Sequence, residues 1–76
     1  MNETIKSAKE LGLLIRKSRI RSGFARAQVA AYSRVGPRFV FDLENGKPTV
    51  HIGKVFDVLH ALGLTLQIKT RQFGNE

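Results

Sequence analysis

The sequence predicts an all-α domain of four to five short helices, followed by one short β-strand. Three observations support this: apolar residues recur at three- and four-residue spacing over most of the chain, glycine and proline interrupt that spacing at short intervals, and residues alternate between apolar and polar only near the C-terminus. We therefore expect a helical domain at 1–63, a strand at 64–71 and a tail at 72–76. With 76 residues and no cysteine, the chain fits one domain without disulfides.

The first helix is expected from about Ser7 to Ser22. Ser7 can cap its N-terminus, and Glu10, three residues later, completes a capping box. Gly23 follows the last turn, where a residue with positive φ is common. The expected inward face is Ala8, Leu11, Leu14, Ile15 and Ser18.

A second, short helix is expected over Arg26 to Ser33. Pro37 lacks an amide hydrogen and has a preset φ, so it fits the first position of a new helix and not the middle of one. A third helix is therefore expected from Pro37 to about Glu44, with Asn45-Gly46 closing it. The inward residues of these two helices would be Val29, Ala30, Val40 and Leu43.

A fourth helix is expected from about Val50 to Leu62. Thr49 is the expected N-terminal cap, and Gly63 ends the helix. The apolar spacing predicts a core face made by Ile52, Val55, Phe56, Leu59 and Leu62.

The last segment, 64–71, alternates between apolar and polar residues, which is typical of a half-buried strand. Its apolar positions are Leu64, Leu66 and Ile68. A lone strand leaves its backbone unpaired, so the simplest partner is the same strand of a second subunit, antiparallel across a two-fold axis. The alternative is a frayed tail or a strand that lies on the chain's own helices.

The charge is strongly basic. Thirteen Lys and Arg residues against six Asp and Glu give a formal net charge of +7, and eight basic residues but only two acids fall between Arg16 and Lys47. Such a field favours a polyanion, and nucleic acid is a better interpretation than a solvated surface. The chain has neither an apolar run long enough to cross a membrane nor a secretory N-terminus, so we expect a cytoplasmic protein without a membrane partner.

Two short helices joined by a turn, the second of which begins with a basic residue, are typical of a helix-turn-helix motif. Residues 11–64 resemble the Cro/XRE family of repressor domains, most specifically in FVFDLENGK at 39–47. The tail, ALGL at 61–64 and the alternating segment, resembles the HipB-like antitoxin branch. The resemblance implies a lambda-repressor-like fold and a homodimer that binds a palindromic operator in double-stranded DNA. For this branch it also implies a HipA-like kinase toxin as partner.

Within the third helix, which the resemblance makes the recognition helix, Arg38 is the expected base reader. A guanidinium matches the O6/N7 edge of guanine, and a phosphate contact is the alternative. Phe41, one turn onward, could touch a thymine methyl or pack in the core or an interface. Gly36 and Pro37 have no side chain that can hydrogen-bond a base, so we expect operator shape to supply part of the specificity.

Four further residues are expected to contact the DNA backbone. Arg26, at the start of the second helix where the family more often has glutamine, can reach a phosphate. Arg34 lies in the turn, with plain solvent exposure as its alternative. Asn45 and Lys47 match family positions that hold the backbone. The resemblance also implies a structural pair that links the first helix to the end of the recognition helix, Arg19 and Glu44.

Other classes of function fit less well. His51 and His60 are nine residues apart and lack the i, i+4 spacing of helical metal ligands, and no nucleophile motif accompanies them. We therefore expect no catalysis, cofactor or metal. RNA binding is disfavoured because the chain lacks an aromatic platform on a sheet. A stand-alone regulator without a toxin, and a protein-binding module that has lost DNA binding, remain alternatives.

Overall fold

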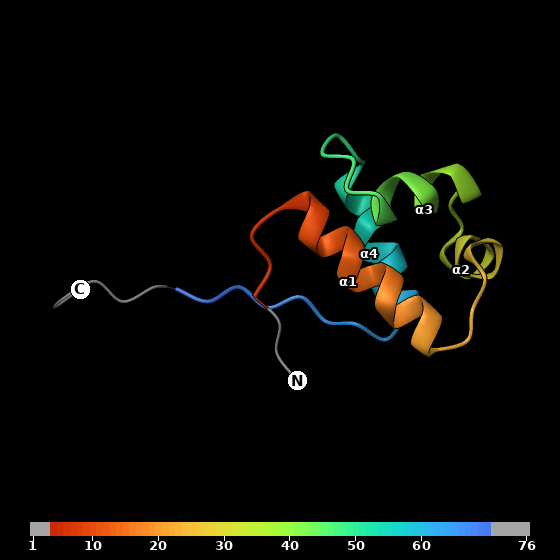
Figure 1. Cartoon of the computed structure of the whole chain (residues 1–76), viewed down its shortest axis with the longest axis horizontal. Helices are drawn as coiled ribbons and strands as arrows, with labels where there is room; N and C mark the ends of the chain where they lie inside the picture. The colour runs from red at the N-terminus through yellow and green to blue at the C-terminus, as the bar shows by residue number, and fades with distance from the viewer. Residues whose placement is uncertain (1–3, 71–76) are drawn as a thin grey trace, which may run out of the picture.

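Four helices make up the regular structure of the computed structural model, which describes residues 4–70 (Figure 1). They are α1 (Ala8–Arg21), α2 (Arg26–Ser33), α3 (Pro37–Glu44) and α4 (Ile52–Ala61). The all-α prediction is confirmed for this part of the chain. Residues 64–70 have no regular secondary structure in the single chain. Arg71, the last residue of the expected strand, and the tail at 72–76 lie outside the described residues.

The ends of α1 follow from local sequence, as predicted. The Ser7 hydroxyl oxygen accepts a hydrogen bond from the backbone N–H of Glu10 (3.1 Å), and the Glu10 carboxylate accepts one from the backbone N–H of Lys6 (2.7 Å). Gly23 has a φ of +78°, the left-handed conformation that lets the chain leave the helix. The Ser7 cap and the place of Gly23 were predicted from sequence, because they depend on residues a few positions apart. The capping box differs from the prediction, since Glu10 accepts from the backbone N–H of Lys6 and not from that of Ser7.

Helices α2 and α3 begin and end at the predicted residues. Pro37 occupies the first turn of α3, and Gly46 follows the helix with a φ of +80°. A Cβ at Gly46 would come within 2.7 Å of the Cα of Lys9. Glycine therefore allows both the turn and the close approach of this loop to α1.

The N-terminus of α4 differs from the prediction. The helix begins at Ile52, and its cap is His51, whose Nδ1 accepts a hydrogen bond from the backbone N–H of Lys54 (3.4 Å). The expected cap, Thr49, is an exposed loop residue. An imidazole nitrogen can accept the same unpaired amide as a hydroxyl, and this role for His51 has no signal in the usual capping preferences.

The buried face of α4 also differs from the prediction. Val58 is fully buried, whereas Ile52 is 65% exposed and Phe56 is 40% exposed. Apolar residues cover more than one side of this helix, so its periodicity did not select a single face. Packing of α4 against α2, where Ala30 is small and buried, turns the inward face toward Val58.

One apolar core joins the helices: α1 packs on α3, and α2 packs on both α3 and α4 (Figure 1). The buried core consists of Ile15, Val29, Ala30, Val40, Leu43, Val55, Val58 and Leu59. No helix within residues 4–70 is long and apolar enough to span a membrane. The core holds the inward side of α3 and leaves its other side to solvent.

Gly12 determines how closely α1 approaches the C-terminal end of α3. It is buried, and a Cβ built there would clash with the carbonyl oxygen of Leu43 and would lie 2.9 Å from that of Glu44. Any larger residue would force the two helices apart. Gly12 therefore fixes one end of the predicted recognition helix.

Candidate nucleic-acid interface

Helix α3 has one side in the core and one side in solvent. Val40, Leu43 and Glu44 are buried, whereas Arg38 and Phe41 are exposed. The side chain of Arg38 is 81% exposed. The N-terminal half of α3 is thus presented outward, which is the geometry a helix needs to enter a DNA groove.

Two guanidinium groups lie near the ring of Phe41. The Cζ atom of Arg26, from α2, is 5.4 Å from the centre of its ring, and that of Arg38, from α3, is 5.2 Å away. Both distances are within the range of cation–π attraction. The structure therefore brings the predicted phosphate contact Arg26 and the predicted base contact Arg38 together around one aromatic ring.

Asp42 was not among the predicted site residues, yet it contacts two of them. Its Oδ1 lies 3.1 Å from the Nε of Arg38, and its Oδ2 lies 3.7 Å from the Nζ of Lys47. The i, i+4 spacing of Arg38 and Asp42 is the sequence signal that would have found the first contact. A carboxylate thus lies within the basic surface of α3.

Glu44 is buried at the other end of α3 and carries two ion pairs. Its carboxylate is paired with Arg19, through contacts of 2.6 Å to Nε and 3.2 Å to Nη2, and with Arg26, 3.0 Å to Nε. The side chains of Glu44 and Arg19 are 0% and 9% exposed. Arg19 also donates to the carbonyl oxygen of Phe24 (2.8 Å). The pair named from the resemblance is therefore in contact, and Arg26 joins it.

Asn45 and Lys47 follow α3 directly. The side-chain N–H of Asn45 donates to the carbonyl oxygen of Phe41 (2.8 Å), so Asn45 satisfies an acceptor near the end of α3. Lys47 is 53% exposed and pairs with Asp42. Together with Arg26 and Arg38, these residues form one group around α3, which we call the α3 cluster: Arg26, Arg38, Phe41, Asp42, Asn45 and Lys47.

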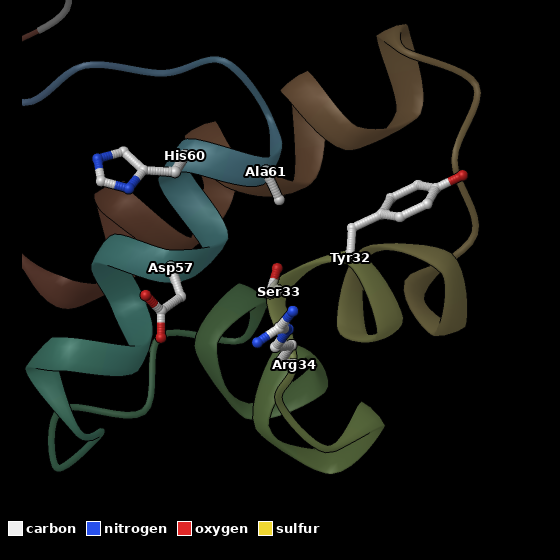
Figure 2. A pocket seen from close by; sticks show the side chains of 6 residues that line it. All are labelled: Tyr32, Ser33, Arg34, Asp57, His60 and Ala61. Carbon is white, nitrogen blue, oxygen red and sulfur yellow. The ribbon is translucent and has the colours of Figure 1, made fainter.

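Arg34 lies apart from the α3 cluster. It caps the C-terminus of α2 with a φ of +60°, the only positive φ of a non-glycine residue within 4–70. It lines a shallow pocket of about 530 Å³ between the ends of α2 and α4 (Figure 2). The lining residues are Tyr32, Ser33, Arg34, Asp57, His60 and Ala61.

The charges of the α3 cluster suit a polyanion. Arg26, Arg38 and Lys47 each expose part of their side chains, whereas Asp42 is 18% exposed and Glu44 is fully buried beside Arg19. Three cations therefore face solvent around one mostly covered carboxylate. Such a field attracts phosphate groups.

Comparison with known proteins gives related sequences and a shared fold, although no family model matches the chain. An uncharacterised HTH-type transcriptional regulator of Sinorhizobium fredii, y4mF, is 41% identical over 68 residues, 90% of each chain. The crystal structure of the clp gene regulator ClgR from C. glutamicum is 31% identical, with a TM-score of 0.69, over 82% of this chain and 80% of that one.

HipB, in its complex with HipA and O2-O3, is similar in fold. The TM-score is 0.86 at 17% identity, over 93% of this chain and 100% of that chain, so this likeness shows the fold alone. The relative from Sinorhizobium is similar over nearly its whole length and is a regulator. The chain therefore belongs to the helix-turn-helix transcriptional regulators, which are DNA-binding proteins and not enzymes.

Proposed function

We propose that this protein is a sequence-specific repressor that inserts the N-terminal half of α3 into the major groove of a palindromic operator. The observation that carries the proposal is the α3 cluster, in which the exposed Arg38 of α3 and the partly exposed Arg26 of α2 both lie near Phe41. Arg38 is the base reader, with guanine as its preferred base. Phe41 lies beside it, within reach of a thymine methyl.

Backbone contacts hold the register of this helix on the duplex. We assign them to Arg26 at the start of α2, to Arg34 in the turn before α3, and to Asn45 and Lys47 directly after α3. Gly36 caps α3 without a side chain, and Pro37 has no hydrogen-bond donor. Direct readout therefore depends on few side chains, and the shape of the operator supplies the remaining specificity.

The proposed repressor acts as a homodimer through 64–71. In the single chain, Leu64 is partly buried, but Leu66 is 46% exposed and Ile68 is 92% exposed. A groove of about 1380 Å³ is lined by residues of 63–69, of α1 and of 4–6. Figure 1 shows the backbone of the N-terminal segment close to that of the C-terminal segment. Pairing of the segment with its copy would cover these side chains and satisfy backbone groups that a lone strand leaves open.

A HipA-like kinase toxin is the proposed protein partner, which would make the chain a HipB-like antitoxin in the bacterial cytoplasm. The support is the shared fold, since one of the HipB structures also contains HipA. A stand-alone regulator, and a module that has lost DNA binding, are the alternatives. A kinase-like gene directly beside this one would favour the antitoxin, and its absence would favour the stand-alone regulator.

A gel-shift titration with the DNA upstream of the protein's own gene tests DNA binding. Affinity should fall on the order of a hundredfold or more between about 50 and 200 mM salt, because several phosphate contacts release counterions. Arg38→Ala should weaken operator binding by about 1–3 kcal/mol while the fold stays intact. The matched control is Arg16→Ala, which removes the same charge from an exposed position on α1. Binding that is absent or insensitive to salt would contradict the proposal.

Deletion of residues 67–76 tests the dimer. Sedimentation should show a shift toward monomer, because the deletion removes Ile68 and most of the proposed strand. Deletion of 72–76 alone should leave the dimer intact. A dimer that persists after the longer deletion would place the association surface elsewhere.

A further inference from the structure

We infer that Asp42 is a specificity-determining residue, which acts with Phe41 to orient the guanidinium of Arg38 toward a guanine. This inference rests on the proposed function, because it concerns how the same site distinguishes one DNA sequence from another. Its basis is the two contacts that Arg38 makes in the α3 cluster, one with the Asp42 carboxylate and one with the Phe41 ring.

Both guanidiniums that face Phe41 are tied to a carboxylate through Nε. For Arg26 the carboxylate is Glu44 (3.0 Å), and for Arg38 it is Asp42 (3.1 Å). Both guanidiniums also lie near the ring of Phe41, with Cζ 5.4 Å and 5.2 Å from its centre. Arg26 donates a hydrogen bond to Glu44, and Arg38 forms an ion pair with Asp42, so each arginine has a carboxylate and an aromatic ring beside it.

The Asp42 carboxylate lies beside the Nε end of the Arg38 guanidinium, at 3.1 Å, and forms an ion pair with it. This leaves the Nη side of the guanidinium for the ligand. The two Nη groups remain as a planar fork, which is the part that can donate to the O6 and N7 of one guanine at the same time. Asp42 and Phe41 thus restrain Arg38 in a form suited to bidentate readout.

Restraint before binding matters because Arg38 is so exposed. A free arginine samples many rotamers, and ordering them on the DNA opposes binding. A side chain that is 81% exposed has few packing contacts to hold it, so Asp42 and Phe41 supply most of the restraint that the structure offers. This restraint strengthens binding only where a guanine lies opposite the two Nη groups of Arg38.

The charge of Asp42 has the opposite effect on DNA in general. The Asp42 carboxylate pairs with Arg38 and Lys47, so it lowers the positive charge of the α3 cluster and weakens binding to any duplex. This loss is the same on every duplex and does not change the preference for a sequence. The preference depends on the orientation of the Arg38 Nη groups, which contributes only where a guanine lies opposite them.

The test compares Asp42→Ala with Asp57→Ala, which removes the same charge from α4, in the pocket beside Arg34. The probes are a duplex that the wild-type protein selects from a random pool and a scrambled duplex of the same composition. Dissociation constants are measured by fluorescence anisotropy at one salt concentration. Asp42→Ala should bind the scrambled duplex more tightly, and its preference for the selected duplex should fall about tenfold. Asp57→Ala should keep the wild-type preference.

An equal gain on both duplexes would show that Asp42 acts only through its charge and would overturn the inference. A second measurement replaces the guanine that Arg38 reads with 7-deazaguanine, which removes the N7 acceptor. This should weaken the wild-type complex several-fold and the Asp42→Ala complex much less. An equal loss in both proteins would also overturn the inference. Failure of the wild-type protein to prefer any duplex would instead overturn the proposed function.

Discussion

The two ends of α3 use the same chemistry in different surroundings. At the C-terminal end, Glu44 and Arg19 form a buried pair with side chains 0% and 9% exposed. At the N-terminal end, Arg38 pairs with Asp42, but the arginine side chain is 81% exposed. One helix therefore has an end anchored in the protein and an end presented to solvent.

The difference shows how a small domain separates stability from recognition. Removal of one partner from a buried ion pair leaves an uncompensated charge and costs about 3–5 kcal/mol, whereas an exposed i, i+4 pair contributes about 0.3–0.5 kcal/mol. The buried end can therefore fix the orientation of α3. The exposed end can change its side chains with little effect on the fold.

Glu44→Gln should have the largest effect, a loss of about 3–5 kcal/mol in the free energy of unfolding. Arg19 and Arg26 would keep their charges beside a neutral amide, and Arg19 cannot move into solvent without opening the core. Urea denaturation measures this loss, with Asp57→Asn as an exposed control. A loss below about 1 kcal/mol would show that the pair does not anchor α3.

Gly12→Ala should destabilise the protein by about 1–3 kcal/mol, because the new methyl group meets the backbone carbonyls of Leu43 and Glu44. The control is Gly36→Ala at the other end of α3, where a Cβ has no neighbour within 4 Å. Gly36 is the N-cap of α3, where alanine is less favourable than glycine but reduces the entropy of the unfolded chain, so the loss should be about 0.5 kcal/mol, smaller than that of Gly12→Ala. Equal losses of stability in the two variants would mean that α1 does not hold the C-terminal end of α3 more tightly than its N-terminal end is held.

Arg38→Ala should have the smallest effect on stability, a change within about 0.5 kcal/mol, because the arginine side chain is 81% exposed and Lys47 still pairs with Asp42. Thermal unfolding by circular dichroism measures it on the same preparation used for the gel shift. A loss above about 1 kcal/mol would show that the N-terminal end of α3 is also anchored.

Much of the fold could be predicted because its signals are local. Pro37 acts on neighbouring backbone groups and so sets the start of α3, and the bounds of both α2 and α3 agreed with the prediction. The buried face of α4 could not be predicted in this way. Its apolar residues occupy several sides, and only contact with α2 decided that Val58 is buried and Ile52 exposed.

In the candidate site, too, some residues could be predicted from the sequence, whereas the contacts between helices could not. Arg26 and Arg38 could be named from residue type and position in the motif. That both lie near the ring of Phe41 could not be predicted, because the two arginines are on different helices and the contact depends on how α2 packs against α3. The ion pair of Asp42 with Arg38 could have been predicted from their i, i+4 spacing, but it was overlooked.

The sequence by itself determined the four helical segments, most of their ends and the excess of positive charge around α3, because each depends on residues close together in the chain. Tertiary structure alone decided which side of α4 is buried, how near α1 comes to the end of α3, and which carboxylate holds which arginine. Those features depend on contacts between distant segments, and such contacts form only when the helices share one core.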